Sequence, residues 1–154
     1  MKLVRKNRAN RLAAMIGYRR GLSLDEATKA AEANLALIEG DCLASLDQAL
    51  AVIYQHVPQL CQGQAQPHAE TIYQAANQVL SLGAHCQRAT LGKAAYCLCD
   101  LIDRSRATGR WNAPALEAHL KALKRLRHPE ADTGPEIEEA VIDGLLKVNK
   151  KVSR

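Results

Sequence analysis

Phenylalanine is absent from this 154-residue sequence, and aromatic residues of all kinds make up only 3% of it. The core must therefore be built from Leu, Ile, Val and Ala side chains. Such a core favours packed helices over a β-sandwich, whose strands depend on β-branched and aromatic residues. Strand patterns, internal repeats and low-complexity tracts are also missing. We therefore predict an all-α protein.

Long apolar runs are missing as well. No run reaches the roughly 18 residues that a membrane span needs, and the first residues lack the apolar segment of a secretory signal. The five cysteines, at positions 42, 61, 86, 97 and 99, include no CxxC pair and are odd in number. Buried thiols in a reducing cytoplasm are the simplest account of them. We expect a cytoplasmic protein without a membrane span.

Motifs of common catalytic and metal sites are not found either. The sequence contains no GxxxxGK[ST], GxGxxG or GxSxG pattern. Cys97 and Cys99 would point about 200° apart on a helix, so they cannot hold one ion together. His85 and Cys86 are adjacent, which is not a chelating spacing. We expect no enzyme activity, no metal and no cofactor.

Positive charge is concentrated at the start of the chain. The net charge is +5, and residues 1–20 contain seven Lys or Arg and no acidic residue. We predict a basic arm or helix over 1–20, a helical bundle over 21–150 and a basic tail over 151–154. A basic arm can contact nucleic acid, but Tyr18 is its only aromatic residue for base stacking. The basic segment 121–128 equally fits the exposed face of a bundle helix, so nucleic acid is not the expected partner.

Apolar residues recur at helical spacing in five or six segments. Ser23 and Glu26 form a capping box before the first segment, and the sequence EGD at 39–41 interrupts it weakly. Two prolines predict a loop over 58–67. The remaining segments begin after Pro67, at Thr90, at the capping residue Asn112 and at Thr133. Short loops between them predict an antiparallel bundle, with a four-helix core and one or two extra helices.

Two neighbouring segments carry a more specific pattern. Ala76-Asn77 lies in one segment, and Leu91, Ala94, Ala95, Leu98 and Asp100 follow in the next. Residues 71–110 thereby resemble a histidine phosphotransfer (Hpt) domain, the helical-bundle carrier of two-component phosphorelays. In that family one helix reads A-H-x-L-K-G-S/A and the next reads L-x-x-L-A-x-x-L-E. The chain is also similar to small alphaproteobacterial proteins encoded with chemotaxis genes.

The sequence departs from the family pattern at the reactive positions. Asn77 stands where the phosphoryl-accepting histidine is expected, Leu80 where the family has Lys, and Ser81 where it has Gly. An amide nitrogen is delocalised into its carbonyl and cannot replace imidazole as a phosphoryl carrier. The resemblance therefore implies a non-catalytic Hpt-like signalling adaptor. Its implied partner is a response-regulator receiver domain or a histidine kinase of a two-component or chemotaxis pathway.

The resemblance also implies where the partner would dock. The implied docking residues are Tyr73, Asn77, Leu80, Ser81 and Ala84, with Arg88 and Lys93 nearby to complement an acidic receiver pocket. Tyr73 and Leu80 are the expected anchors, since a few apolar contacts dominate small interfaces. On a helical wheel Asn77 lies at the edge of the apolar arc, which also suits an ordinary boundary asparagine.

Two other functions stay open. His85, with Arg88 and Ala89 three and four positions later, imitates the Hpt pattern locally and would make the chain an active histidine phosphotransferase. A bend would then have to fall inside a good helix-forming segment. His119 is expected to be a part-buried core histidine. The third function is a structural or oligomeric bundle, for which Ile142 and Leu146, outside the last apolar stripe, would form a homodimer face.

Overall fold

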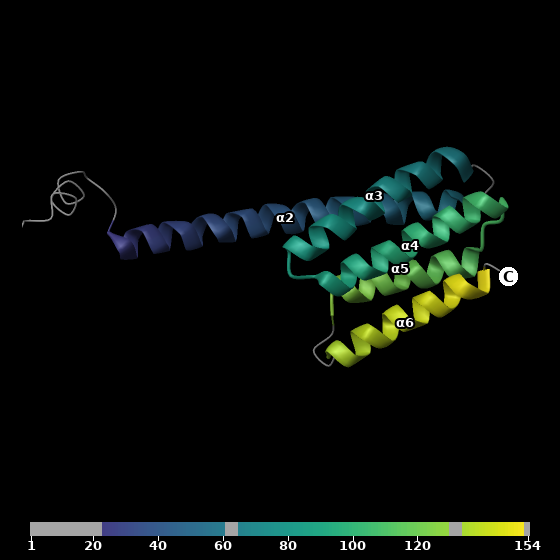
Figure 1. Ribbon diagram of the computed structural model, residues 1–154. Helices are drawn as coiled ribbons and strands as arrows, with labels where there is room; N and C mark the ends of the chain where they lie inside the picture. The colour runs from purple at the N-terminus through teal and green to yellow at the C-terminus, as the bar shows by residue number, and fades with distance from the viewer. Residues whose placement is uncertain (1–22, 61–64, 130–133, 153–154) are drawn as a thin grey trace, which may run out of the picture. The chain divides into compact units, whose positions relative to one another are not determined.

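The computed structural model describes residues 23–60, 65–129 and 134–152. Its helices are α2 (Leu24–Leu60), α3 (Ala65–His85), α4 (Ala89–Thr108), α5 (Ala113–Arg127) and α6 (Pro135–Val152) (Figure 1). Helices account for 91% of the described residues, and none of these residues forms a strand. The predicted all-α helical bundle is confirmed, whereas the antiparallel arrangement stays a prediction. None of the described helices is long and apolar enough to cross a membrane.

The chain divides into two units, Met1–Ile38 and Glu39–Arg154. The division falls inside α2, whereas the sequence placed it after residue 20; the predicted arm over 1–20 lies outside the described residues. In the first unit the capping box forms as predicted. The Ser23 hydroxyl accepts from the Glu26 N–H at 3.2 Å, and a Glu26 carboxylate oxygen accepts from the Ser23 N–H at 2.7 Å. Leu24, Leu35 and Ile38 are exposed despite their helical spacing.

Helix α2 is continuous where the sequence predicted two segments and a loop. The EGD interruption at 39–41 is wrong, because one glycine in a helix costs only about 1 kcal/mol relative to alanine. The loop predicted from position 58 begins too early, because Pro58 lies inside α2. Burial of Val57 and Leu60 offsets the hydrogen bond that Pro58 cannot make. Pro67 lies in the first turn of α3, where no intrahelical bond needs its N–H.

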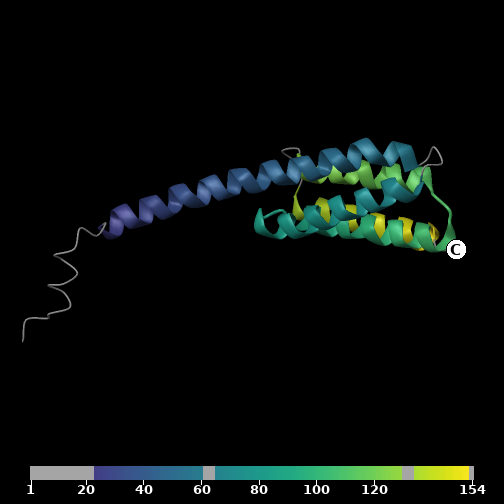
Figure 2. The ribbon, with the colours of Figure 1, turned by 90° about the horizontal axis from the view of Figure 1, so that it is seen from above.

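The core of the second unit is aliphatic, as the absence of phenylalanine requires. Helix α4 lies at its centre, where it contacts α3, α5 and α6 (Figure 1), and half of its twenty residues are buried. Residues 39–60 of α2 lie alongside α5 (Figure 2), where Asp47 accepts two hydrogen bonds from the Arg127 guanidinium at 2.7 and 2.9 Å. This pair holds the pKa of Asp47 below its usual range.

A polar side chain helps to hold α6 against α4, and a second polar side chain is buried in α5. The Asn149 side-chain N–H group donates to the Cys97 carbonyl at 2.7 Å and to the Asp100 carboxylate at 2.9 Å. His119 of α5 lies in the core as predicted, but it is fully buried where partial burial was expected, and its Nδ1–H donates to the Ala115 carbonyl at 2.8 Å. Burial lowers the pKa of His119, although that hydrogen bond and the Asp100 charge oppose the shift.

This buried imidazole makes folding sensitive to mild acid. The unfolded chain takes up a proton on His119 near pH 6.5, whereas the folded chain takes it up only at lower pH. The unfolding free energy should therefore fall as the pH drops below about 6.5, by at most about 1.4 kcal/mol per pH unit from this group. Urea unfolding between pH 8 and 5 measures the slope. Because His119→Gln removes the group, an equal slope in that variant would contradict the assignment.

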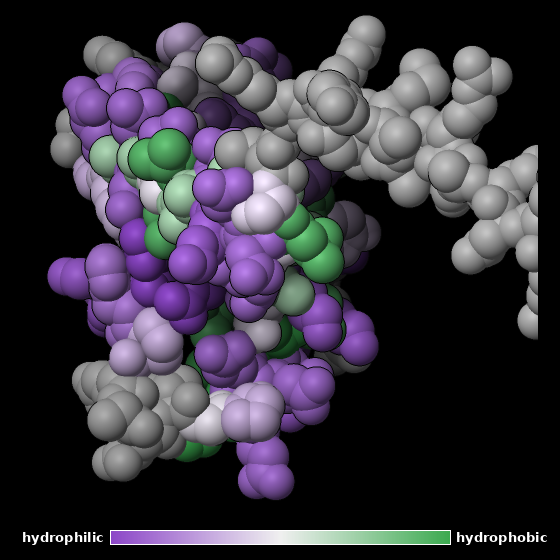
Figure 3. Space-filling view, turned by 90° about the vertical axis from the view of Figure 1, so that its left-hand side faces the viewer, coloured by the Kyte–Doolittle hydropathy of each residue, from purple (hydrophilic) through white to green (hydrophobic). Residues whose placement is uncertain are grey.

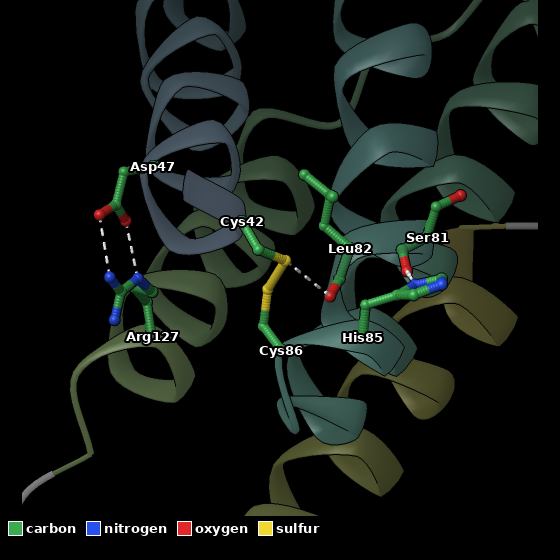
Figure 4. Close-up of a disulfide and its surroundings, with 7 residues drawn as sticks. All are labelled: Cys42, Asp47, Ser81, Leu82, His85, Cys86 and Arg127. Atoms are coloured by element: carbon green, nitrogen blue, oxygen red, sulfur yellow. Dashed lines mark hydrogen bonds and ion pairs between the residues drawn. A yellow bond between two sulfur atoms is a disulfide. The ribbon is translucent and has the colours of Figure 1, made fainter. Parts of the chain in front are cut away.

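Two cysteines are paired, contrary to the expectation of free thiols throughout. Cys42 of α2 and Cys86, directly after α3, form a disulfide with a Cα–Cα distance of 6.4 Å (Figure 4). The Cys42 sulfur, which carries no proton in the disulfide, lies 4.0 Å from the Leu82 carbonyl oxygen. Cys97 and Cys99 are free and buried, and Cys61 lies outside the described residues. The argument from free thiols to a cytoplasmic location therefore does not apply to two of the five cysteines.

Candidate functional site

The five predicted docking residues on α3 form one side of that helix. Each of the positions 73, 77, 80, 81 and 84 has another of them three or four residues away, and all five lie within an arc of roughly 100° on one side of the helix. Tyr73, Asn77 and Leu80 are half-buried, whereas Ser81 and Ala84 are exposed. We call these five residues the α3 face. Its half-buried residues anchor it to the bundle, and its exposed residues leave it open to a partner.

Asn77 lies at the boundary between core and solvent. Its neighbour Ala76 is fully buried, and Gln78 on the other side is exposed. The Asn77 side-chain N–H group donates to the Tyr73 carbonyl of the preceding turn at 3.1 Å. This side chain is thus held along its own helix and is not buried deep between helices. It offers an amide, but no nucleophile, to a molecule on the α3 face.

Tyr73 is held by an arginine that the sequence analysis missed. The Arg106 guanidinium of α4 lies 5.3 Å from the centroid of the Tyr73 ring. Arg106 also forms a 2.7 Å ion pair with Glu70, one turn before Tyr73 on α3. A cation over an aromatic ring that is at least partly exposed contributes about 0.5–1 kcal/mol. No local pattern could have signalled this contact, because Tyr73 and Arg106 come from different helices.

Close helix packing fixes the other end of the α3 face. A Cβ atom on Gly92 of α4 would lie 3.2 Å from the Leu80 carbonyl oxygen. A Cβ atom on Gly83 would lie 3.0 Å from both the Arg88 carbonyl oxygen and the Gly92 nitrogen. The two glycines therefore let the backbones of α3 and α4 approach closely beside Leu80.

The connection from α3 to α4 is correspondingly short. Gln87 adopts a left-handed conformation with φ of 54°, and the Arg88 N–H donates to the Gly83 carbonyl at 2.7 Å. The predicted site residue Arg88 is half-buried in this connection, and Lys93 is exposed in the first part of α4. Tyr96 follows Lys93 by three residues and is 60% exposed. This exposed aromatic residue of α4 was also missed from the sequence.

His85 is available to solvent at the end of α3. It is exposed, and its Nδ1 lies 2.8 Å from the Ser81 carbonyl oxygen (Figure 4). Because a carbonyl only accepts hydrogen bonds, Nδ1 carries the proton. The lone pair of the neutral ring is then on Nε2. His85 therefore keeps the atom that a nucleophilic imidazole needs.

The other surfaces considered from the sequence are less specific. In the basic segment 121–128, Lys121, Lys124, Arg125 and His128 line a shallow depression. Ile142 is half-buried, whereas Leu146 is 40% exposed, so the proposed homodimer pair is only partly exposed. On the face drawn in Figure 3 the hydrophobic residues occupy small separate areas within a hydrophilic surface. None of these surfaces brings together as many predicted residues as the α3 face.

Comparisons with protein-family models, with curated proteins and with solved structures found no match to this chain. Over the described parts of the chain, no group of three or more His, Cys, Asp or Glu residues could hold a metal ion. The interpretation of the site therefore depends on the geometry of α3 and α4 and on the sequence pattern that runs through both helices.

Proposed function

We propose that this protein is a non-catalytic, Hpt-like signalling adaptor that docks a receiver domain or a histidine kinase through the α3 face. The observation that carries the proposal is the placement of Asn77. It is a half-buried amide at the position of the family's reactive histidine, in the middle of a helix face whose other predicted residues remain accessible. A docking surface would thus be kept while phosphoryl chemistry is lost.

The chemistry of the surface fits a receiver domain in two ways. Tyr73 and Leu80 present apolar area that is supported from α4, by Arg106 and by the backbone at Gly92 respectively. Lys93 and Arg88 lie at the Ala84 end of the face and supply positive charge towards an acidic pocket. A small transient interface needs a few supported anchors of this kind, surrounded by polar residues.

Binding to purified receiver domains and kinase domains of the source organism tests the proposal. Tyr73→Ala/Leu80→Ala should weaken binding of the cognate domain at least about tenfold, because it removes both anchors. Ala84→Glu should do the same without altering the core, since Ala84 is exposed. Biolayer interferometry measures both effects.

A matched control lies on α5. Glu117 and Lys121 form an exposed ion pair on that helix, away from the α3 face, so Glu117→Ala/Lys121→Ala should leave the affinity unchanged. The circular dichroism melt of each variant shows whether it is folded. Equal affinity for wild type, the anchor variant and Ala84→Glu would overturn the α3 face as the docking surface.

One observation favours a second function, an active phosphoryl carrier at His85. The exposed ring has its Nδ1–H engaged by Ser81, which leaves Nε2 as a nucleophile. The adaptor proposal expects no acid-labile phosphoryl label on the protein after incubation with autophosphorylated kinases. A label that appears on wild type and is lost in His85→Gln would favour the carrier instead. Asn77→Ala should leave either result unchanged.

A further inference from the structure

Two histidines meet between α2 and α3, away from the α3 face. His56 lies near the end of α2, and His68 lies in the first turn of α3. Their Nδ1 atoms are 2.8 Å apart, their ring centroids are 5.1 Å apart, and the ring planes are inclined at 44°. Both side chains are half-buried. Two imidazole nitrogens from different helices thus converge at a place that solvent can reach.

The contact constrains what lies between the rings. A neutral imidazole has one N–H and one lone-pair nitrogen, so two Nδ1 atoms at hydrogen-bond distance can share one proton. Two lone pairs at this distance repel each other unless a cation lies between them. A transition-metal ion can replace the proton in this role, because neutral imidazole nitrogen is a common ligand of Zn²⁺, Ni²⁺ and Cu²⁺.

The spacing also suits chelation. Two nitrogens that each lie about 2.0–2.1 Å from one ion are roughly 2.9 Å apart when they meet it at a right angle. They are roughly 3.3 Å apart at a tetrahedral angle. The observed 2.8 Å is close to the first value, but the ring centroids, 5.1 Å apart, place the two nitrogens face to face along one line. Each ring would therefore have to turn by roughly 45° to direct its lone pair at the ion. The ion would lie to one side of the line between the nitrogens.

We propose that His56 and His68 form a binding site for a divalent transition-metal ion. No third His, Cys, Asp or Glu completes the site within the described segments, so water fills the remaining coordination positions, which the half-exposed rings leave open. His56 and His68 were considered as ligands from the sequence, but no metal site was expected, because the two residues are twelve positions apart and show no chelating spacing. Bound metal would join α2 to the start of α3 and stabilise the folded state by mass action.

The proposal is tested on full-length protein purified without a histidine tag. Isothermal titration with Ni²⁺ and with Zn²⁺ should give one ion per chain, and both ions should raise the melting temperature until EDTA is added. Ni²⁺ and Zn²⁺ favour imidazole, whereas Mg²⁺ favours oxygen ligands, so Mg²⁺ should have no effect.

Variants of single histidines assign the site. His56→Gln and His68→Gln should each weaken binding at least about tenfold and abolish the rise in melting temperature, because each removes one of two ligands. His85→Gln and His128→Gln remove exposed histidines elsewhere and should bind as wild type does. Melting without metal shows whether the variants fold. Wild type that binds neither ion, or unchanged binding in both His56→Gln and His68→Gln, would overturn the proposal.

Discussion

Breaking the Cys42–Cys86 disulfide is expected to lower the unfolding free energy by as much as about 4 kcal/mol. The two cysteines are 44 positions apart, so the bond closes a long loop in the unfolded chain. Chain-entropy arguments give a stabilisation that grows slowly with loop length and reaches this value for a loop of this size. Small domains are stable by only about 5–15 kcal/mol, so the bond would supply a large share.

Urea unfolding with and without dithiothreitol measures this effect. Wild type should lose stability in the reductant, and Cys42→Ser/Cys86→Ser should match reduced wild type under both conditions. Burial raises the pKa of Cys99 to about 11 and also raises that of Cys97, so neither thiol should exchange with the disulfide at neutral pH. A wild-type midpoint that reductant does not change would contradict a stabilising bond.

The disulfide also bears on where the protein works. A reducing cytoplasm keeps most thiols free, whereas oxidising compartments preserve disulfides. The cytoplasmic location predicted from the sequence and a permanent Cys42–Cys86 bond are therefore in conflict. Alkylation of the protein in intact cells, followed by mass spectrometry of the Cys42 and Cys86 peptides, shows whether the two cysteines are free or bonded to each other in the cell.

Local signals in the sequence predicted the starts of α2, α4 and α5 well, whereas α3 begins at Ala65, before the start predicted after Pro67. Asn112 caps α5 as expected, because its side-chain oxygen accepts from the Ala115 N–H at 2.9 Å. Thr90 was predicted as the start of a helix that begins at Ala89. These features depend on residues within one turn of each other, so the chain encodes them without reference to the fold. The apolar stripe of α4 was predicted for the same reason.

A local prediction was wrong: a weak break was expected at 39–41, but α2 continues through it. The features that the sequence did not predict depend on residues far apart in the chain. The disulfide, the Arg106–Tyr73 contact and the His56–His68 pair each join two segments. Spacing within one helix says nothing about which residue of another helix lies opposite. The α3 face could be predicted because all five of its residues belong to a single helix.

The second large expected effect is a loss of stability when Gly83, where the backbones of α3 and α4 approach closely, is replaced by a larger residue. A Cβ atom at this position would meet three backbone atoms at 3.0–3.1 Å, on Arg88 and Gly92. Backbone atoms cannot rotate away as a side chain can, so the start of α4 would have to shift. Overpacking of this kind costs about 1–3 kcal/mol. Alanine's helix propensity returns up to about 1 kcal/mol, so Gly83→Ala should destabilise the protein by up to about 2 kcal/mol.

A larger branched residue should make the loss clearer. Gly83→Val adds two methyl groups to the same clash and has a lower helix propensity than alanine, so we expect a loss of about 3 kcal/mol or more. Gly144→Ala is the matched control, since Gly144 lies inside α6 and a Cβ atom there would meet nothing within 4 Å. That variant should gain up to about 1 kcal/mol in urea unfolding. Gly83→Ala with a similar gain would show that α3 and α4 are farther apart beside Leu80, and the support for that anchor would be lost.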